Sequence, residues 1–466
     1  MVGPDYHLPQ DAALNRPAAQ APFVAAGEAS FRNASLPTKW WRLYDDPELD
    51  ALIEKAFVAN TDLRIASANL ARARAMLEEA RMGETPAVSV SAAPSYGRAS
   101  AAAKGLANPL ADGWSHDGGL GVSYQLDLFG KIARGIEAAG ADTGVAQAAY
   151  DLTRVTVAAE TAKAYAEACT SVQQMRTAEH SIRLQRQFVQ STEQLTRLGR
   201  GTTLDIARTN AQLEKLRAAL PPLQAQQKSA LYRLAVLTGD VPTALVNTIG
   251  KCERAPQIAQ PIPVGDGAGL LRRRPDIRQA ERSLAAATAR IGVATADLYP
   301  SINIGASVGS TGPMSALGDV NAFRWGIGPL ISWTLPNTSI ARSRISQAEA
   351  STQAALAKFD GTVLNALRET ENALTAYARE LDRNALLKAA RDQSASAAQQ
   401  AQRLYRAGRT DFLTALDAQR TLASDDSALA ASTAKLASDQ IAVFLALGGG
   451  WEQEIARAGN GRPERK

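Results

Sequence analysis

The chain has 466 residues, enough for roughly two to four ordinary domains or for one elongated domain with very long helices. Hydrophobic residues make up 45% and charged residues 21%, which excludes a disordered chain. The 51 Lys and Arg residues are spread along the chain and nearly balanced by 46 Asp and Glu, which argues against a nucleic-acid-binding protein. No uninterrupted apolar run reaches about 18 residues, so a helical membrane transporter is excluded too.

The first half of the chain predicts helices and strands in a clear order. Residues with a 3.6-residue period are typical of helices, and alternation over about ten residues is typical of strands. A proline-free tract of this kind at 131–197 predicts a helix on the order of 100 Å long. The expected elements are a helix at 52–83, strands at 87–92 and 119–129 around a loop at 98–117, the long helix, a glycine turn at Gly199 and Gly201, and a returning helix at 204–237.

The second half repeats this order, which indicates an internal duplication. Residues 61–92 align with 275–306 at an offset of 214, and further along the offset becomes 209. We therefore expect a helix at 275–298, strands at 301–308 and 323–335 around a loop at 309–321, a long helix at 340–406, a turn at Gly408 and a returning helix at 412–447. The predicted segments are an extended N-terminal stretch over residues 1–50, repeats at 51–239 and 275–448, a linker at 240–274 and a tail at 449–466.

Helices of this length must pack lengthwise against other long helices. The series Leu356, Phe359, Val363, Ala366, Thr370, Ala373 and Tyr377 repeats at spacings of three and four, as in a coiled coil. A soluble periplasmic coiled-coil adaptor or scaffold would carry the same pattern, so the helices alone leave that alternative open.

The four strands have the length that a tilted strand needs to cross a hydrocarbon layer. A sheet in lipid must close, and four strands cannot enclose a lumen, whereas three chains would supply twelve. One strand face is compatible with lipid, and Trp325 and Trp333 could form an interfacial belt. The strands by themselves fit a soluble β-hairpin lid equally well. The residues of that apolar face are Val88, Val90, Val122, Tyr124, Leu126, Ile302, Ile304, Trp325, Ile327, Ile331 and Trp333.

The residues usually responsible for chemistry are sparse. Cys169 and Cys252 are too few for a disulfide framework or a zinc site, and Cys169 fits a small core residue on an apolar helix face. Arg272–Arg274 is interpreted as a solvated loop with local ion pairs, and the glycine cluster 265–269 as a flexible linker. The sequence contains no phosphate loop, HExxH motif or nucleophile with a base, so we expect neither enzyme activity nor a cofactor or metal.

Several motifs, in the same order along nearly the whole chain, resemble those of the TolC/OprM-like outer membrane factors. This resemblance implies a mainly helical fold with a transmembrane β-barrel: a homotrimer with a 12-stranded barrel, four strands per protomer, continued by a long periplasmic α-helical barrel. The motifs are Val2-Gly-Pro-Asp-Tyr6, Trp40-Trp-Arg-Leu-Tyr-Asp-Asp-Pro-Glu-Leu49, Leu126-Asp-Leu-Phe-Gly130, Leu271-Arg-Arg-Arg-Pro-Asp-Ile-Arg278, Gly292-Val-Ala-Thr-Ala-Asp-Leu-Tyr-Pro300, Leu416-Asp-Ala-Gln-Arg420 and Ala446-Leu-Gly-Gly-Gly-Trp451.

The resemblance also implies a function, a location and partners. It implies an outer-membrane exit duct of a tripartite multidrug efflux pump in a Gram-negative bacterium, in contact with outer-membrane lipid. The implied partners are a periplasmic adaptor (membrane fusion) protein and, through it, an inner-membrane proton-driven drug transporter. The same duct could serve a type I secretion or metal-efflux system. A lipid-anchored cysteine is implied just before Val2 and is absent from this chain, so we expect that the signal peptide and anchor are missing.

The closed end of the duct is expected where the long helices turn. Leu413, Asp417 and Arg420 fall on one helical face just after the second turn, and threefold symmetry would bring three copies of each together. The residues alone fit a surface ion pair better, and the resemblance is what implies a constriction here, with Tyr405 matching a position near it. The tips expected to contact the adaptor are Gly199, Arg200, Gly201, Thr202, Gly408, Arg409 and Thr410.

The two halves differ in the returning helix. Pro221 and Pro222 interrupt the first one, whereas the aligned positions in the second are alanines, Ala430 and Ala431. Because an interior proline removes a helix hydrogen bond and bends the axis, we expect a kink in the first hairpin only.

Overall fold

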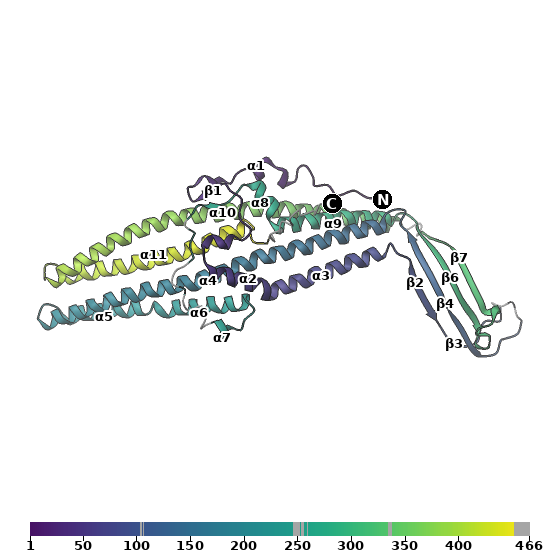
Figure 1. The fold of residues 1–466 in the computed structure, drawn as a ribbon, viewed down its shortest axis with the longest axis horizontal. Coiled ribbons are helices and arrows are strands. Elements are labelled where there is room, and N and C mark those ends of the chain that lie inside the picture. The colour runs from purple at the N-terminus through teal and green to yellow at the C-terminus, as the bar shows by residue number, and fades with distance from the viewer. Residues whose placement is uncertain are drawn as a thin grey trace, which may run out of the picture. The chain divides into compact units, whose positions relative to one another are not determined.

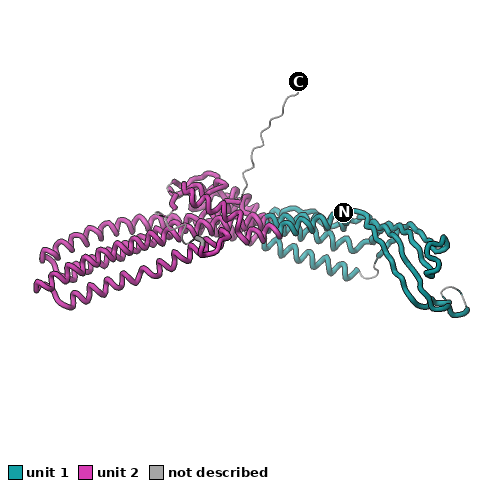
Figure 2. The backbone as a smooth tube through the Cα atoms, turned by 60° about the horizontal axis from the view of Figure 1, so that its bottom comes forward, with its two compact units in different colours: residues 1–10, 69–147, 279–359 teal, residues 11–68, 148–278, 360–466 magenta. Residues whose placement is uncertain are grey.

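The structure, a computed structural model, describes residues 1–102, 105, 107–245, 252, 256–258, 260–333 and 338–451. It contains two compact units, each assembled from three separate stretches of chain (Figure 2). Unit 1 consists of Met1–Gln10, Asn69–Gln147 and Gln279–Phe359, and unit 2 of Asp11–Ala68, Ala148–Arg278 and Asp360–Lys466. The predicted tail beyond Trp451, and the predicted strand end at 334–335, lie outside the described residues.

Unit 1 contains an antiparallel sheet with the strand order β2–β4–β6–β7, and a short strand, β3, that also pairs with β4 (Figure 1). Each of the four main strands matches an expected one, but β4 begins six residues earlier than predicted and β6 runs on into the predicted loop. The bounds are β2 Ala87–Ala92, β3 Ser95–Gly97, β4 Gly113–Leu126, β6 Ser301–Pro313 and β7 Phe323–Ser332.

The long helices follow the predicted ranges closely. α4 covers Lys131–Arg197 and α10 covers Thr338–Arg406, each without interruption. Both helices contribute residues to both units, as do α3 (Thr61–Met82) and α9 (Pro275–Ala296). The returning segment is two helices in the first half and one in the second: α5 Thr203–Arg217, α6 Leu220–Leu237 and α11 Phe412–Ala446.

The single helix predicted at 52–83 is wrong, because the chain divides there into α2 (Pro47–Ala59) and α3. Asn60 separates them with an extended ψ of 132°. Its side-chain oxygen accepts hydrogen bonds from the backbone N–H groups of Asp62 (2.9 Å) and Leu63 (3.1 Å). Asn60 therefore caps the N-terminus of α3, a role for which asparagine is well suited.

The main core of unit 2 gathers segments from both ends of the chain. The short 3₁₀ helix η3 (Trp40–Tyr44) places Trp40 against Phe444 of α11, with stacked rings 4.6 Å apart. Val363 and Ala366 of the coiled-coil series are fully buried in α10. The smaller elements of this unit are η1 Ala13–Asn15, α1 Pro17–Gln20, η2 Val24–Gly27, α7 Pro242–Leu245, α8 Gly267–Arg273 and the parallel pair β1 Phe31–Arg32 with β5 Ile262–Pro263.

The arginine run is not a solvated loop. Arg272 and Arg273 end α8, and the Arg274 side chain is only 10% exposed. Its guanidinium donates to Asp276 (2.6 and 3.0 Å), to Glu369 (2.9 Å) and to the backbone oxygen of Ala446 (2.8 Å). Arg274 therefore closes the C-terminal end of α11, whose last carbonyl groups have no partner within the helix. The glycine cluster before it is likewise ordered, because it begins α8.

The two cysteines form a disulfide bond, which the sequence analysis does not predict. Cys169, on α4, is bonded to Cys252, in the segment between α7 and β5, across 83 positions of sequence. Cys169 is also buried in the core, so the prediction of a core position is correct.

Candidate lumen, junction and helical tip

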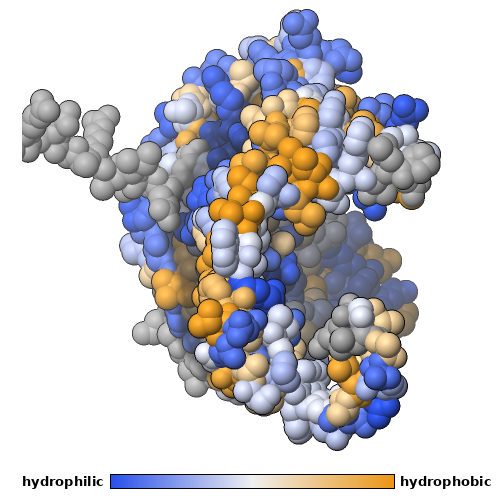
Figure 3. Space-filling model, turned by 90° about the vertical axis from the view of Figure 1, so that its right-hand side faces the viewer, coloured by the Kyte–Doolittle hydropathy of each residue, from blue (hydrophilic) through white to orange (hydrophobic). Residues whose placement is uncertain are grey.

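The pairing registers place large apolar side chains on one face of the sheet. Directly paired residues in antiparallel strands lie on the same face, so Val90, Leu120, Val308 and Trp325 form one row across all four strands. All four side chains are exposed, Val90 by 80% and Trp325 by 74%. Seen from the strand end, hydrophobic residues gather in a band (Figure 3). The face consists of Val88, Val90, Leu120, Val122, Tyr124, Leu126, Ile302, Ile304, Ala306, Val308, Phe323, Trp325, Ile327 and Ile331.

The opposite face of the sheet carries small and polar residues. Its rows include Ser89 opposite Gly121, and Asn303 between Gln125 and Leu330. An apolar face beside a polar one is the pattern of a transmembrane β-barrel, in which lipid-facing and lumen-facing residues alternate.

Aromatic side chains lie at both ends of the strands. At the loop end, Tyr96 and Trp114 pack with ring centroids 5.6 Å apart, and Trp325 lies two residues after the start of β7. At the helix end, Phe129 and Tyr299 stack at 4.5 Å. Trp333 follows the end of β7, about 26 Å along the strand from Trp325 at 3.3 Å per residue. This separation matches the apolar band of a membrane barrel with an aromatic girdle at each interface.

In the described part of the chain, no helix is both long and apolar enough to cross a bilayer.

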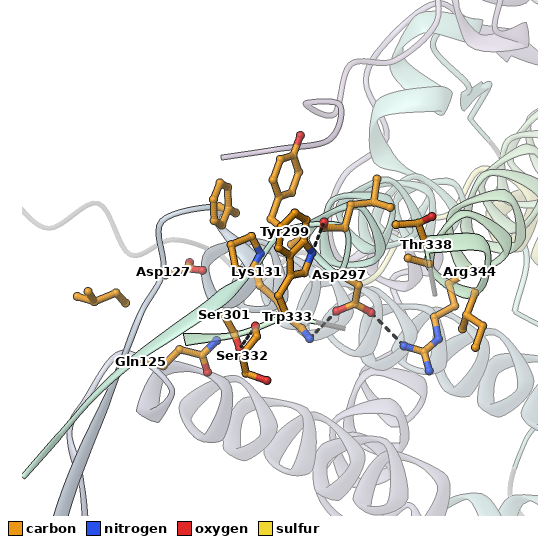
Figure 4. A pocket seen from close by; sticks show the side chains of 17 residues that line it. Gln125, Asp127, Lys131, Asp297, Tyr299, Ser301, Ser332, Trp333, Thr338 and Arg344 are labelled. Carbon is orange, nitrogen blue, oxygen red and sulfur yellow. Dashed lines mark hydrogen bonds and ion pairs between the residues drawn. The ribbon is translucent and has the colours of Figure 1, made fainter. Parts of the chain in front are cut away.

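A cavity of about 340 Å³ lies where the strands of unit 1 give way to helices (Figure 4). Asp297, just after α9, pairs on one oxygen with Lys131 of α4 (2.6 Å) and on the other with Arg344 of α10 (3.2 Å). Asp127 accepts from the N–H groups that begin α4, at Ile132 (3.1 Å) and Ala133 (2.8 Å). These contacts join the helix ends below the sheet. The sequence analysis does not predict this cluster, although Asp127, Lys131 and Asp297 lie within or beside two of the recognised motifs.

The helical turns of unit 2 are built from glycine and N-terminal caps. Gly199 and Gly408 have φ values of 74° and 68°, a conformation that favours glycine. Thr202 and Asp205 form a capping box at the start of α5, while Asp411 caps α11 by accepting from Thr414 N at 2.9 Å. The two predicted tips lie together, because the guanidinium of Arg200 rests against Gly408. Gly201, Arg409 and Thr410 belong to the same turns.

The predicted gate residues separate into two environments. Leu413, Asp417 and Arg420 are exposed on one face of α11, and Leu413 is 56% exposed. Tyr405 is instead buried, with its ring 5.6 Å from that of Phe188 and 6.0 Å from that of Phe412. Burial raises the pKa of Tyr405. The first three residues are therefore available to a neighbouring protomer, and Tyr405 packs α10 against α4 and α11 instead.

The break between α5 and α6 lies beside the two prolines. Ala218 and Ala219 connect the helices with helical φ values but shallow ψ angles of −15° and −19°. Pro221 and Pro222 occupy the first turn of α6, where the missing N–H groups need no helical partner. α11 continues without a break past the aligned Ala430 and Ala431.

Comparison with known proteins gives consistent matches over the chain. The family model described as "Outer membrane efflux protein" matches residues 52–240 and 269–449. A probable efflux pump outer membrane protein, TtgC of Pseudomonas putida, is 29% identical over 98% of this chain and 93% of its own length. Nodulation protein T of Rhizobium leguminosarum bv. trifolii is 28% identical over 98% and 96%. The solved structure of the outer-membrane channel OprN is 36% identical, with a TM-score of 0.90 over 97% of this chain and 99% of that one.

Proposed function

The chain belongs to the outer membrane efflux protein family, and on this premise we propose that it forms the exit duct of a tripartite drug-efflux pump. Its fold is that of the trimeric outer membrane channels, a 12-stranded β-barrel continued by a helical barrel. The observation that carries the proposal is the two-faced sheet of unit 1. Both of its edges, β2 and β7, lack a partner strand within the described chain, so copies of the chain must close it.

We propose that the duct is closed at the periplasmic helical turns. Asp417 and Arg420 are exposed at i and i+3, and three copies around an axis can pair with one another between neighbouring α11 helices. Leu413 lies one turn closer to the tip and would form an apolar collar. Such a ring narrows the passage and sets its ion preference.

The proline break supports unequal opening of the two hairpins. Ala218 and Ala219 separate α5 from α6, whereas α11 is one continuous helix. We therefore propose that the first hairpin bends more readily than the second. If the prolines cause the difference, Pro221→Ala with Pro222→Ala should bring amide exchange in the first returning helix to the level of the second. An exchange difference that persists in this variant would contradict the cause.

The paired turns are the proposed contact for a periplasmic adaptor. Arg200 and Gly408 bring the two tips of one protomer together, which would present them as a single surface. The adaptor would in turn link the duct to an inner-membrane proton-driven transporter. The Cys169–Cys252 disulfide supports a periplasmic location of unit 2, because disulfides persist in oxidising compartments.

A lipid anchor ahead of Val2 would emerge beside the strand–helix junction. Val2 N donates to the oxygen of Phe129 at 3.0 Å, next to the aromatic pair at the helix end of the sheet. The buried Arg134 guanidinium donates to the oxygen of Gly3 (3.3 Å) and to Asp5 (2.6 Å). These bonds hold the N-terminal stretch where an attached acyl chain would reach the membrane edge.

Single-channel recording in a planar bilayer tests the proposal. We expect the wild-type protein to purify in detergent as a trimer and to show a low conductance, which Asp417→Ala should raise by removing the ring between neighbouring helices. Asp382→Ala is the matched control, because Asp382 is an exposed α10 carboxylate that pairs with Arg379 one turn away on the same helix. A protein that stays monomeric, does not insert into lipid and conducts no ions would refute the proposal of a duct. Equal conductance in wild type and Asp417→Ala would refute the gate alone.

A further inference from the structure

The lumen-facing side of the sheet has a distinctive charge pattern. The pairing registers assign it the odd-numbered residues of β2, β3, β4 and β6 and the even-numbered residues of β7. Nearly all of these are Gly, Ala, Ser, Thr, Asn or Gln, with Leu330 and Pro313 as the apolar members. Within these five strands, only Asp117 of β4 and Arg324 of β7 are ionisable on this face.

These two residues pair across the strand that separates them. Arg324 is directly opposite Gly309 of β6, and Gly309 is directly opposite Gly119 of β4, two residues from Asp117 on the same face. Arg324 Nη2 lies 2.5 Å from Asp117 Oδ1. The arginine side chain therefore crosses β6 where neither Gly309 nor Gly119 places a side chain in its path.

The glycines at this crossing are required by the backbone as well. A Cβ on Gly119 would lie 2.6 Å from the oxygen of Val308, and one on Gly309 would run into the oxygen of Gly118. The strands thus approach too closely here for any other residue. The pair remains open to water, with the Arg324 side chain 47% exposed and the Asp117 side chain 58% exposed.

The pair lies toward the loop end of the sheet. Arg324 is the second residue of β7, which begins at the loop, and Asp117 is the fifth residue of β4, which begins at the same end. In the family fold this end opens to the exterior, and the rest of the same face on the five described strands is uncharged.

We infer that Arg324 and Asp117 form a charge-balanced ring at the outer mouth of the lumen, three pairs in the trimer, which keeps the exit indifferent to the sign of small permeating ions. This inference rests on the proposed function as a duct. Each carboxylate neutralises an arginine at short range, so the ring has almost no net field. Loss of either partner would leave three like charges around the exit.

The expected effect can be estimated from screening. At 0.1 M salt the Debye length is about 10 Å, so three like charges about that far from the axis raise the local concentration of one ion and lower that of the other by about twofold each. The local ratio of cations to anions therefore changes by about fivefold. At 1 M salt the Debye length falls to about 3 Å and the effect should disappear.

Reversal potentials under a KCl gradient test the ring. Arg324→Gln should shift the permeability ratio toward K⁺ by about fivefold, Asp117→Asn toward Cl⁻ by a similar factor, and the double variant should return to the wild-type value. Ser307→Ala, a neutral change on the same face, should have no effect. Each variant is also recorded with Asp417→Ala, so that the periplasmic end does not dominate the measurement.

The opposite signs of the two shifts separate a field effect from a structural one. If the pair only stabilised the sheet, both single variants would change trimer yield together and neither would change selectivity. Conducting trimers without opposed shifts would overturn the ring and leave the duct intact. Absence of conductance in every protein, including wild type, would overturn the duct and the ring with it. Should a single variant fail to assemble, the charge swap Arg324→Asp with Asp117→Arg should conduct with wild-type selectivity, and a strong preference for one ion in the swap would refute the ring.

Discussion

Replacement of Arg274 by methionine should speed amide exchange at the C-terminal end of α11. Replacement of Arg272, two positions earlier in the same arginine run, is the control. Arg274 is buried and donates to Asp276, Glu369 and the oxygen of Ala446. Methionine keeps most of the apolar volume but removes every donor. The Ala446 carbonyl then keeps only the 3.3 Å bond from Thr370 Oγ1. Arg272 is exposed and donates, among the described residues, to the oxygen of Ala268 in its own helix.

The magnitude follows from these contacts. A buried carbonyl that loses its charged donor costs about 1–3 kcal/mol, and loss of a charged hydrogen bond to a partly buried carboxylate costs about 1.5–3 kcal/mol. Glu369 is half-exposed and regains water, so we count the carbonyl and Asp276 only and expect about 3 kcal/mol for Arg274→Met. This corresponds to roughly a hundredfold loss of protection, since 1.4 kcal/mol is a factor of about ten. Arg272→Met should change protection by less than about twofold.

Amide hydrogen exchange of the last turn of α11, followed by mass spectrometry on the detergent-purified protein, measures this difference directly. The reporters are the N–H groups of Leu447 and Gly448, which bond to Val443 and Leu445. Equal exchange in the Arg272 and Arg274 variants would refute the idea that the buried guanidinium closes the helix. So would unchanged protection in Arg274→Met.

Three further predictions concern unit 2 and its tips. Cys169→Ser with Cys252→Ser should lower the free energy of unfolding by about 4.5 kcal/mol on the chain-entropy model for an 83-residue separation. The Tm of this variant should fall by as much as the Tm of the wild-type protein falls when its disulfide is reduced, and an unchanged Tm would contradict the prediction. Gly408→Ala should increase protease cleavage at the tips, because the new methyl group meets Arg200, whereas Gly318→Ala, equally left-handed but in open space, should leave them intact. Hydrogen bonds from Thr414 hold the pKa of Asp411 below its ordinary value of 3.8. The Asp411 cap therefore stabilises α11 fully above pH 3.8, and this stabilisation is lost as the pH falls further. Amide exchange in the first turn of α11 should rise only in strong acid, and a rise already at about pH 6 would contradict the prediction.

Much of the architecture is predictable from local pattern. The helices predicted at 131–197 and 412–447 agree with α4 and α11 to within one residue at each end, because their apolar period continues without proline and their ends carry glycine or capping residues. Alternation of apolar and polar residues is enough to identify the lipid-facing side chains of each strand. The division at Asn60 is not predicted although its signal is local, because the helical period continues across it while the side chain caps the next helix.

The sequence by itself thus determined which segments are helical, which alternate, and that the chain is duplicated, since these depend on neighbours within a few residues. Only the tertiary structure decided which residues far apart in the sequence contact one another. These pairs are Cys169 with Cys252, Arg274 with the end of α11, Tyr405 with Phe188, and Arg324 with Asp117 across Gly309. The physical reason is that strand register and helix packing bring together residues tens to hundreds of positions apart. A shift of the register by one residue would move each side chain to the other face of the sheet.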